Sequence, residues 1–181
     1  MYSIFSLGVS ELEVAQDESQ NLTYKIALGY EFHRKWYVEA GYQQLGYDDL
    51  YTSALPTESD VIKGRSVKQG DALFLAFLGK ASNHHGELFY RLGVLKTDIR
   101  GQFIQEASQE CSLGKAIAIE VENYGSANLC DYNEGGAAAV LGLGFDFFIG
   151  ARTLIRTEAE YIKGQNDLEM SALSIGLRYN F

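Results

Sequence analysis

Charged residues inside strand-like segments are the first candidates for chemistry in this sequence. They alternate with apolar residues, so within each segment they share one polar face. Four basic and four acidic residues occupy this face: Lys25, Glu39, Arg91, Asp146, Arg156, Glu158, Glu160 and Arg178. Such side chains suit a gated or proton-conducting pore, or an ion-pair network that fills a narrow interior. We favour the network, because a narrow interior is normally filled by side chains and a lone buried charge is costly.

Three histidines, His33, His84 and His85, fall in short turns between the strand-like segments. Ser82 lies close to two of them in the sequence, which superficially suggests a nucleophile and its base. Neighbouring turn residues rarely reach the geometry of a catalytic triad, so a solvated turn is the stronger interpretation. We therefore predict no catalytic residue, no cofactor-binding residue and no metal ligand.

The two cysteines, Cys111 and Cys130, lie in a long polar segment away from the histidines. This spacing gives no support to a metal site. The pair fits a disulfide formed in an oxidising compartment, and the alternative is two free thiols in a cytosolic protein. A bridge would enclose the strand-forming run 116–121, which we expect to form a small β-hairpin or packed lid. Tyr124 and Tyr132 are the expected packing residues.

Length and charge restrict the function classes. The 181 residues suffice for one domain, which we expect to span 1–181. The formal net charge of -9 argues against a nucleic-acid partner. The longest uncharged stretch, 135–145, is too short for a membrane-spanning helix, which needs about 20 residues. Met1 leads directly into a strand-like segment, so we expect a mature chain whose export signal was removed.

Alternating apolar and polar residues predict eight strands. Their expected ranges are 2–10, 22–32, 36–43, 67–80, 87–99, 135–149, 152–163 and 170–181. The connections after the second, fourth and sixth strands are short, and those after the first, third and fifth are longer and polar. In the ambiguous segment 67–80, we expect Leu73, Leu75 and Phe77 to point outward. An even number of antiparallel strands with short turns at one end and long loops at the other is typical of an outer-membrane barrel.

A soluble, lipocalin-like barrel would instead turn its apolar face inward. The polar face decides against it, because this face is rich in small residues: Gly8, Ala27, Gly29, Gly41, Gly93, Gly142, Gly144 and Gly176. Small residues suit the restricted interior of an eight-stranded barrel and are not needed on a water-facing surface. Aromatic residues on the apolar face gather near the short turns, where an interfacial girdle belongs.

Three stretches, 28–32, 38–42 and 176–181, resemble the small eight-stranded OmpA-type superfamily of transmembrane barrels, including its OmpX-like members. The resemblance implies an all-β, eight-stranded antiparallel up-and-down transmembrane β-barrel with short periplasmic turns and longer extracellular loops. It also implies a place in the outer membrane of a Gram-negative bacterium. The last strand resembles the terminal assembly signal of such barrels, with Leu177, Tyr179 and Phe181 as the residues that the assembly machinery would contact.

The function expected from these features is a non-catalytic, structural or surface-interaction role of the adhesion or colonisation type. Two alternatives stay open, a small channel and a lipid A-modifying enzyme. The expected partners are outer-membrane lipid, lipopolysaccharide and the assembly machinery, with the protein as a monomer and with no nucleic acid. Acidic loop residues could bind divalent cations that bridge lipopolysaccharide, but no EF-hand-like spacing is present, so a hydrated surface is the default.

Overall fold

The computed structural model describes residues 1–14, 17–47, 65–106, 111, 117–121, 125–165 and 168–181. Its strands are β1 (Tyr2–Val14), β2 (Asp17–His33), β3 (Trp36–Tyr47), β4 (Arg65–Ser82), β5 (Gly86–Glu106), β6 (Ile117–Val121), β7 (Gly125–Phe148), β8 (Thr153–Gly164) and β9 (Glu169–Asn180). No helix in the described part of the chain is long and apolar enough to cross a membrane.

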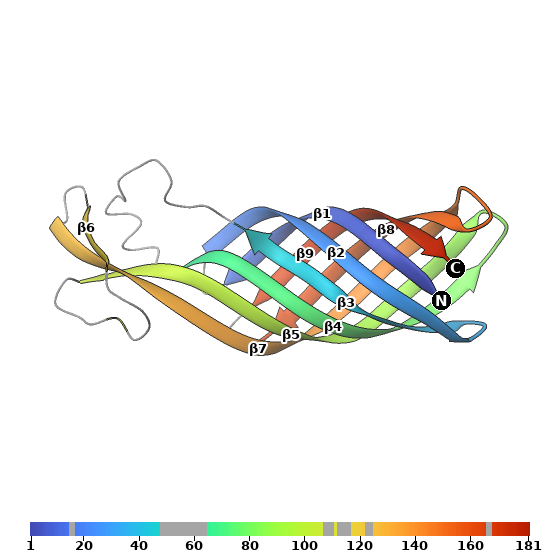
Figure 1. Ribbon diagram of the computed structural model, residues 1–181, viewed down its shortest axis with the longest axis horizontal. Coiled ribbons are helices and arrows are strands. Elements are labelled where there is room, and N and C mark those ends of the chain that lie inside the picture. The colour runs from blue at the N-terminus through green and yellow to red at the C-terminus, as the bar shows by residue number, and fades with distance from the viewer. Residues whose placement is uncertain (15–16, 48–64, 107–110, 112–116, 122–124, 166–167) are drawn as a thin grey trace.

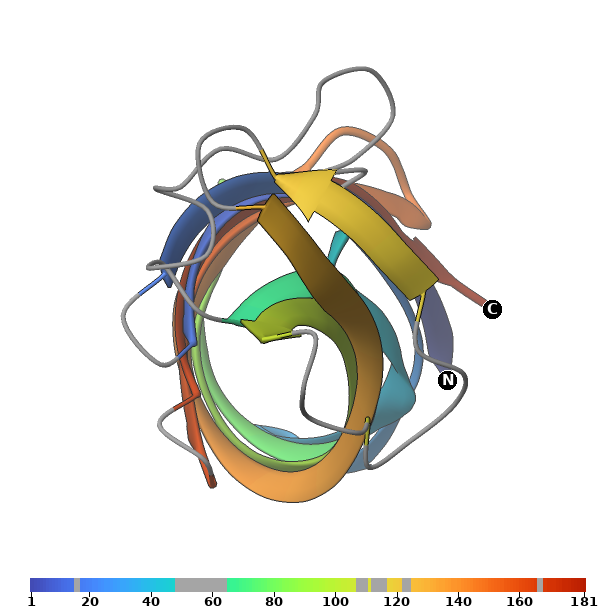
Figure 2. The same ribbon diagram turned by 90° about the vertical axis from the view of Figure 1, so that its left-hand side faces the viewer.

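Eight of the nine strands form a closed antiparallel barrel. Their order is β5-β4-β3-β2-β1-β9-β8-β7, and pairing between β5 and β7 closes the ring (Figures 1 and 2). Closure leaves no barrel strand with an unpaired edge, which is the condition for spanning lipid with strands. The remaining strand, β6, pairs with the distal end of β7 beyond the ring. This confirms the predicted fold class.

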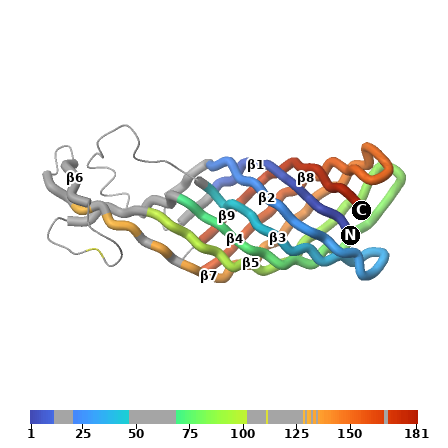
Figure 3. The backbone as a smooth tube through the Cα atoms, in the orientation of Figure 1, coloured from blue at the N-terminus to red at the C-terminus, as the bar shows by residue number. Residues whose placement is uncertain are grey.

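The short connections lie at one end of the barrel together with both chain termini (Figure 1). At the turn between β4 and β5, the side-chain oxygen of Asn83 accepts hydrogen bonds from the backbone amides of His85 and Gly86 at 2.8 and 3.0 Å. This is the usual role of Asn in a tight turn, where its side chain replaces a backbone acceptor. Following the resemblance described above, we call the end with these turns and both termini the periplasmic end, and the opposite end the extracellular end (Figure 3).

The apolar face of the strands points outward. Leu28 on β2, Leu143 on β7 and Ile175 on β9 are 57%, 58% and 60% exposed. In the ambiguous strand β4, residues Leu73, Leu75 and Phe77 point outward as predicted, and Phe74, Ala76 and Leu78 are buried inside. A wall of exposed apolar side chains around a paired backbone matches the requirements of a bilayer interior.

Two predicted loops are wrong in their extent. The segment 11–20 was expected to be turn-like, but β1 continues to Val14 and pairs there with Asp17, the first residue of β2. The segment 101–133 was expected to be one long loop, but β5 extends to Glu106 and β7 begins at Gly125. The side-chain pattern of the apolar wall ends in both places while backbone pairing continues. In 11–14 the alternation changes phase, with Leu12 and Val14 apolar at even positions, and in 101–106 it is lost.

Two glycines lie where neighbouring strands of the barrel approach each other closely. A Cβ atom on Gly176 would lie 2.4 Å from the backbone oxygen of Phe5 on the neighbouring strand. A Cβ on Gly41 would lie 2.2 Å from the backbone oxygen of Ile26. At both positions the close approach of two strands, rather than a turn, requires glycine.

Candidate functional site

Arg156 lies at the centre of a buried ion-pair network in the barrel interior. Its Nη1 donates to Glu39 at 2.8 Å, while Nε and Nη2 donate to the two carboxylate oxygens of Asp146 at 2.6 and 2.8 Å. The Arg156 guanidinium also lies 4.3 Å from the ring centre of Phe89. Because all three ionic side chains are 0% exposed, these bonds replace hydration that the charges have lost.

A second group lies on the extracellular side of the first. Arg91 donates to Glu160 at 2.6 Å and to Glu158 at 3.2 Å. Lys25 contacts both carboxylates from the opposite wall, with a hydrogen bond to Glu158 and an ion pair of 3.0 Å to Glu160. Gln43 adds a hydrogen bond to Glu160 at 3.3 Å. Four strands, β2, β3, β5 and β8, are thus connected across the lumen.

The periplasmic side of the network contains two charged residues that the sequence-based list omitted, Lys80 and Glu87. Lys80 binds Glu87 at 3.0 Å and Asp146 at 3.2 Å. Arg178 binds the same two carboxylates at 2.6 and 2.8 Å. Alternation along the strands could have predicted both residues to be inward. Lys80 shares a face with the inward Leu78, and Glu87 shares a face with the inward Arg91.

All eight charged residues expected on the polar face lie inside the barrel, and the two additions make five basic and five acidic side chains. The network is therefore formally neutral. Among the described residues, a few buried polar atoms lack a protein partner: Ser6 Oγ, Glu39 Oε2, Arg91 Nε and Nη2, Ser174 Oγ and Arg178 Nε. These scattered atoms suit single internal waters, which commonly satisfy buried polar groups.

An apolar cluster lies in the extracellular half of the lumen, beside buried polar residues such as Ser10 and Thr97, and the sequence pattern did not predict it. Leu45, Leu95, Ile162, Leu168 and Met170 converge there and are 0–3% exposed. Leu168 comes from the connection before β9, where hydrogen bonds with Gly164 and Gln165 fold the chain inward. The interior therefore contains an ionic layer and, above it, an apolar layer.

The ends of β5 and β7 form an arm beyond the barrel. They remain paired as far as Glu106 and Ala127, and β6 adds a third strand by pairing with residues 125–129 of β7 (Figure 1). A disulfide joins Cys111 to Cys130, and Cys130 is 0% exposed. Within the run 116–121, the described residues 117–121 form the strand β6, which pairs with β7. Tyr124 and the side chain of Tyr132 lie outside the described residues.

The turn histidines do not assemble a catalytic group. The rings of His84 and His85 stack with centres 3.7 Å apart. Ser82 donates its hydroxyl hydrogen bond to Glu87 at 3.3 Å, so its described partner is a carboxylate and not an imidazole. Within the described ranges, no three His, Cys, Asp or Glu side chains are placed to hold a metal ion.

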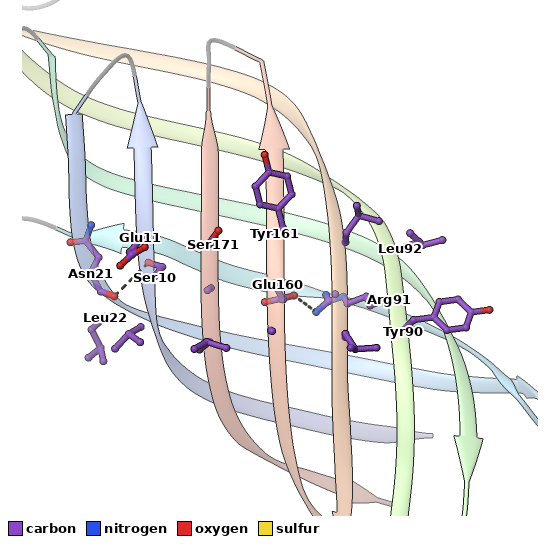
Figure 4. A pocket seen from close by; sticks show the side chains of 17 residues that line it. Ser10, Glu11, Asn21, Leu22, Tyr90, Arg91, Leu92, Glu160, Tyr161 and Ser171 are labelled. Atoms are coloured by element: carbon purple, nitrogen blue, oxygen red, sulfur yellow. Dashed lines mark hydrogen bonds and ion pairs between the residues drawn. The ribbon is translucent and has the colours of Figure 1, made fainter.

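The outer wall carries two hollows between rows of outward side chains. The larger, of about 890 Å³, crosses six strands from Leu22 on β2 to Tyr90 on β5. Figure 4 shows its outward residues Leu22, Leu92 and Tyr90, with the Arg91–Glu160 pair on the inner side of the same wall. The smaller, of about 720 Å³, lies over β2, β3 and β4 around Ala40. Most lining residues of both hollows point outward, so we assign the hollows to the outer wall.

An exposed ion pair marks the extracellular rim above the larger hollow. Lys163 on β8 donates a hydrogen bond to Glu169 on β9. This bond and the positive charge hold the pKa of the Glu169 carboxyl below its ordinary value. Both side chains are exposed, so the pair contributes little to stability.

Leu177, Tyr179 and Phe181, the residues of the expected assembly signal, point outward at the periplasmic end and are 54%, 42% and 70% exposed. The rings of Tyr179 and Phe181 pack edge to face at 5.7 Å, and Trp36 packs in the same way on Tyr90 at 6.1 Å. Amphipathic rings at this level are typical of the interface between lipid and water.

Three solved structures share the architecture. Neisserial surface protein A aligns with a TM-score of 0.63 at 12% identity, over 99% of this chain and 96% of that chain. Ail, the attachment invasion locus protein of Yersinia pestis, aligns with a TM-score of 0.54 at 16% identity, over 99% and 98%. The N-terminal β-barrel domain of Pseudomonas aeruginosa OprF aligns with a TM-score of 0.51 at 9% identity, over 98% and 97%.

No family model and no curated protein sequence matches the chain. The likeness thus rests on three-dimensional architecture, and it agrees with the strand order, the closure and the outward apolar face described above. The chain has the fold of the small eight-stranded outer-membrane β-barrels, to which the OmpA-type and OmpX-like barrels belong.

Proposed function

We propose that this protein is an integral outer-membrane barrel without catalytic or channel activity, and that it presents the β5–β7–β6 arm as an interaction surface outside the cell. The observation that carries the proposal is the arm itself. Strand pairing continues about ten residues past Gly135, and the disulfide ties the preceding connection to β7. A cross-linked sheet is pre-organised, which lowers the entropy lost on binding a partner.

The closed interior supports the absence of conduction. An ion would have to break the Arg156 pairs, lose its own hydration, and then pass the apolar layer formed by Leu45, Leu95 and Met170. Both steps are costly in a dry interior. The Ser82–Glu87 contact likewise supports a non-catalytic role over lipid A modification, since it occupies the only hydroxyl next to the turn histidines.

The name of one structural neighbour, the attachment invasion locus protein Ail, refers to attachment, but this chain shares only its fold with Ail. The remaining partners are proposed from the location. Lipid and lipopolysaccharide would surround the outward face, and the assembly machinery would contact Leu177, Tyr179 and Phe181 on the last strand. We propose a monomer, because the eight-stranded ring is closed without a second copy.

The test compares bacterial cells that display the wild-type barrel with cells that display a variant in which 103–128 is replaced by a short Gly-Gly turn. Attachment to a cultured epithelial monolayer is the readout, and compact migration of the unheated protein on a gel verifies barrel folding. Loss of attachment with a folded barrel supports the proposal. Equal attachment by both proteins contradicts it.

Conductance is tested separately. Purified barrel inserted into a planar bilayer is expected to give no discrete current steps. Reproducible steps in the wild-type protein would establish the channel alternative.

A further inference from the structure

The smaller hollow on the outer wall lies between two rows of side chains. One row is Leu28–Ala40–Leu75, and the next row toward the extracellular end is Ile26–Tyr42–Leu73, with members paired across β2, β3 and β4. Ala40 is exposed between two leucines that are 57% and 48% exposed. Ala40, which has a small side chain, lines the middle of this depression of about 720 Å³ on the outer wall.

Lys96 on β5 continues the upper row, since it pairs directly with Leu73. Residues opposite one another on neighbouring strands have Cβ atoms about 5 Å apart, so the Lys96 side chain can reach the end of the hollow. Lys96 lies ten residues beyond Gly86, the first residue of β5. At about 3.3 Å per residue and a tilt of about 40°, this corresponds to a height of roughly 25 Å, the upper border of an outer-membrane apolar band.

Lys96 is the cation available at this border. It is exposed and makes no ion pair with any residue that the structure describes. Asp98 is paired with Arg100 at 3.3 Å, and the Asp71 carboxylate accepts hydrogen bonds from the neutral groups of Tyr42 and Gln69. An apolar depression that ends at an ammonium group without an ion-pair partner among the described residues is complementary to a lipid with an anionic headgroup.

The larger hollow provides a natural comparison on the same molecule. Its small residue is Ala159, flanked by Leu143 and Leu173 across β7, β8 and β9. Its upper border contains Glu11 and Ser171, and the nearest base on β8, Lys163, is bound to Glu169. Both hollows are apolar, but only the one at Ala40 ends at a cation without a described acidic partner.

We propose that the Ala40 hollow holds one acyl chain of lipid A, the phosphorylated glycolipid of the outer leaflet, and that the ammonium group of Lys96 binds its phosphate. The inference rests on the membrane location proposed above. It adds a defined lipid site on β2–β5 that is independent of the arm. The height of Lys96 selects the outer leaflet, and the charge selects an anionic headgroup over a zwitterionic one.

The experiment reconstitutes the full chain into phosphatidylcholine nanodiscs that contain lipid A, releases it, and counts retained lipid by native mass spectrometry. Wild-type protein is expected to retain one lipid A. Lys96→Gln removes a charge-assisted contact and should lower retention about tenfold. Ala40→Phe fills the hollow, removes contact with about two methylene groups and should have a similar effect.

Ala159→Phe and Lys163→Gln are the matched controls, and both should retain lipid A like the wild-type protein. Compact migration of unheated protein verifies that each variant is folded and inserted. Equal retention by the wild type, Lys96→Gln and Ala40→Phe would overturn the site. Equal retention of phosphatidylglycerol by the wild type would overturn the choice of lipid A, and a dimer mass lost only in Ala40→Phe would assign the hollow to a second copy. Failure of the wild type to enter nanodiscs would instead refute the membrane location.

Discussion

Replacing Arg156 by methionine should destabilise the barrel more than replacing Arg156 and Glu39 together. The single variant leaves Glu39 buried, with the hydroxyl of Tyr2 at 2.8 Å as its described donor. Breaking a buried ion pair by removing one partner costs about 3–5 kcal/mol. In Glu39→Gln/Arg156→Met the network is neutral again, and Asp146 keeps Lys80 and Arg178. The double variant should therefore recover about 2 kcal/mol relative to Arg156→Met.

Urea unfolding in lipid vesicles measures these free energies. Trp36 is the single tryptophan and lies on the outer wall at the periplasmic turn, so its fluorescence reports loss of lipid contact. A double-mutant cycle on the exposed pair Lys163–Glu169 is the control, and its coupling free energy should be below about 1 kcal/mol. Additivity of the two lumen substitutions within about 0.5 kcal/mol, or a double variant less stable than Arg156→Met, would refute the reasoning.

Three further perturbations test the wall, its close contacts and the arm. Leu143→Arg should cost about 2–4 kcal/mol in the same unfolding assay, and unchanged stability would refute lipid contact at this position. Gly176→Ala should lower the free energy of unfolding by about 1–3 kcal/mol, because the new Cβ would lie 2.4 Å from the backbone of β1. Gly150→Ala is the control and should be neutral, because the nearest atom to its new Cβ is 4.0 Å away. Equal effects of the two substitutions would contradict the packing argument. Denatured, unreduced protein should show no thiol labelling at Cys111 or Cys130, and full labelling would disprove the bridge.

Within the membrane, the alternating sequence was sufficient to predict the eight strands, their order and their outward face. Each residue there has only two environments, lipid or lumen, so polarity translates directly into facing. Prediction of strands from alternation was wrong outside the membrane, where residues no longer face either lipid or lumen. Residues 11–14 and 101–106 are paired in strands. In 11–14 the alternation changes phase, because the apolar residues are now Leu12 and Val14 at even positions, and in 101–106 the alternation is lost. Strand length beyond a membrane depends on backbone pairing, which side-chain patterns do not report.

In the lumen, the sequence identified the ionic residues that lie between glycines and outward leucines. It missed Lys80 and Glu87 because they lie next to a turn, where charged residues are ordinarily assigned to solvent. It did not predict the apolar layer, although alternation already placed Leu95 on the face of Arg91, and Ile162 shares the face of Glu160. Alternation gives the facing of each residue, but which lumen side chains meet at one height depends on the register between strands, which only pairing across the sheet establishes.

The net negative charge of this protein lies outside the neutral lumen network. Because five bases and five acids cancel inside, the net charge of -9 belongs to residues outside the network. Around the periplasmic turns the described charges are mainly basic: Arg34, Lys35 and Arg152 against Glu31. The charged side chains that the structure describes at the extracellular ends of the strands are Glu11, Asp71, Asp98, Asp131 and Glu169 against Lys96, Arg100 and Lys163.

An acidic extracellular end is repelled by the phosphates of a lipid surface, but only over the Debye length of about 8–10 Å. From Gly135 to Gly125 the strand β7 continues for ten residues, roughly 33 Å along the strand. The tip of the arm therefore lies beyond the field of the membrane even when the strand is tilted, while the charges at the rim lie within it. Repulsion at the rim favours an arm that stands away from the lipid. With the two sites proposed above, this separation would let one molecule bind a phosphorylated lipid at Lys96 and a different partner at the arm without competition between them.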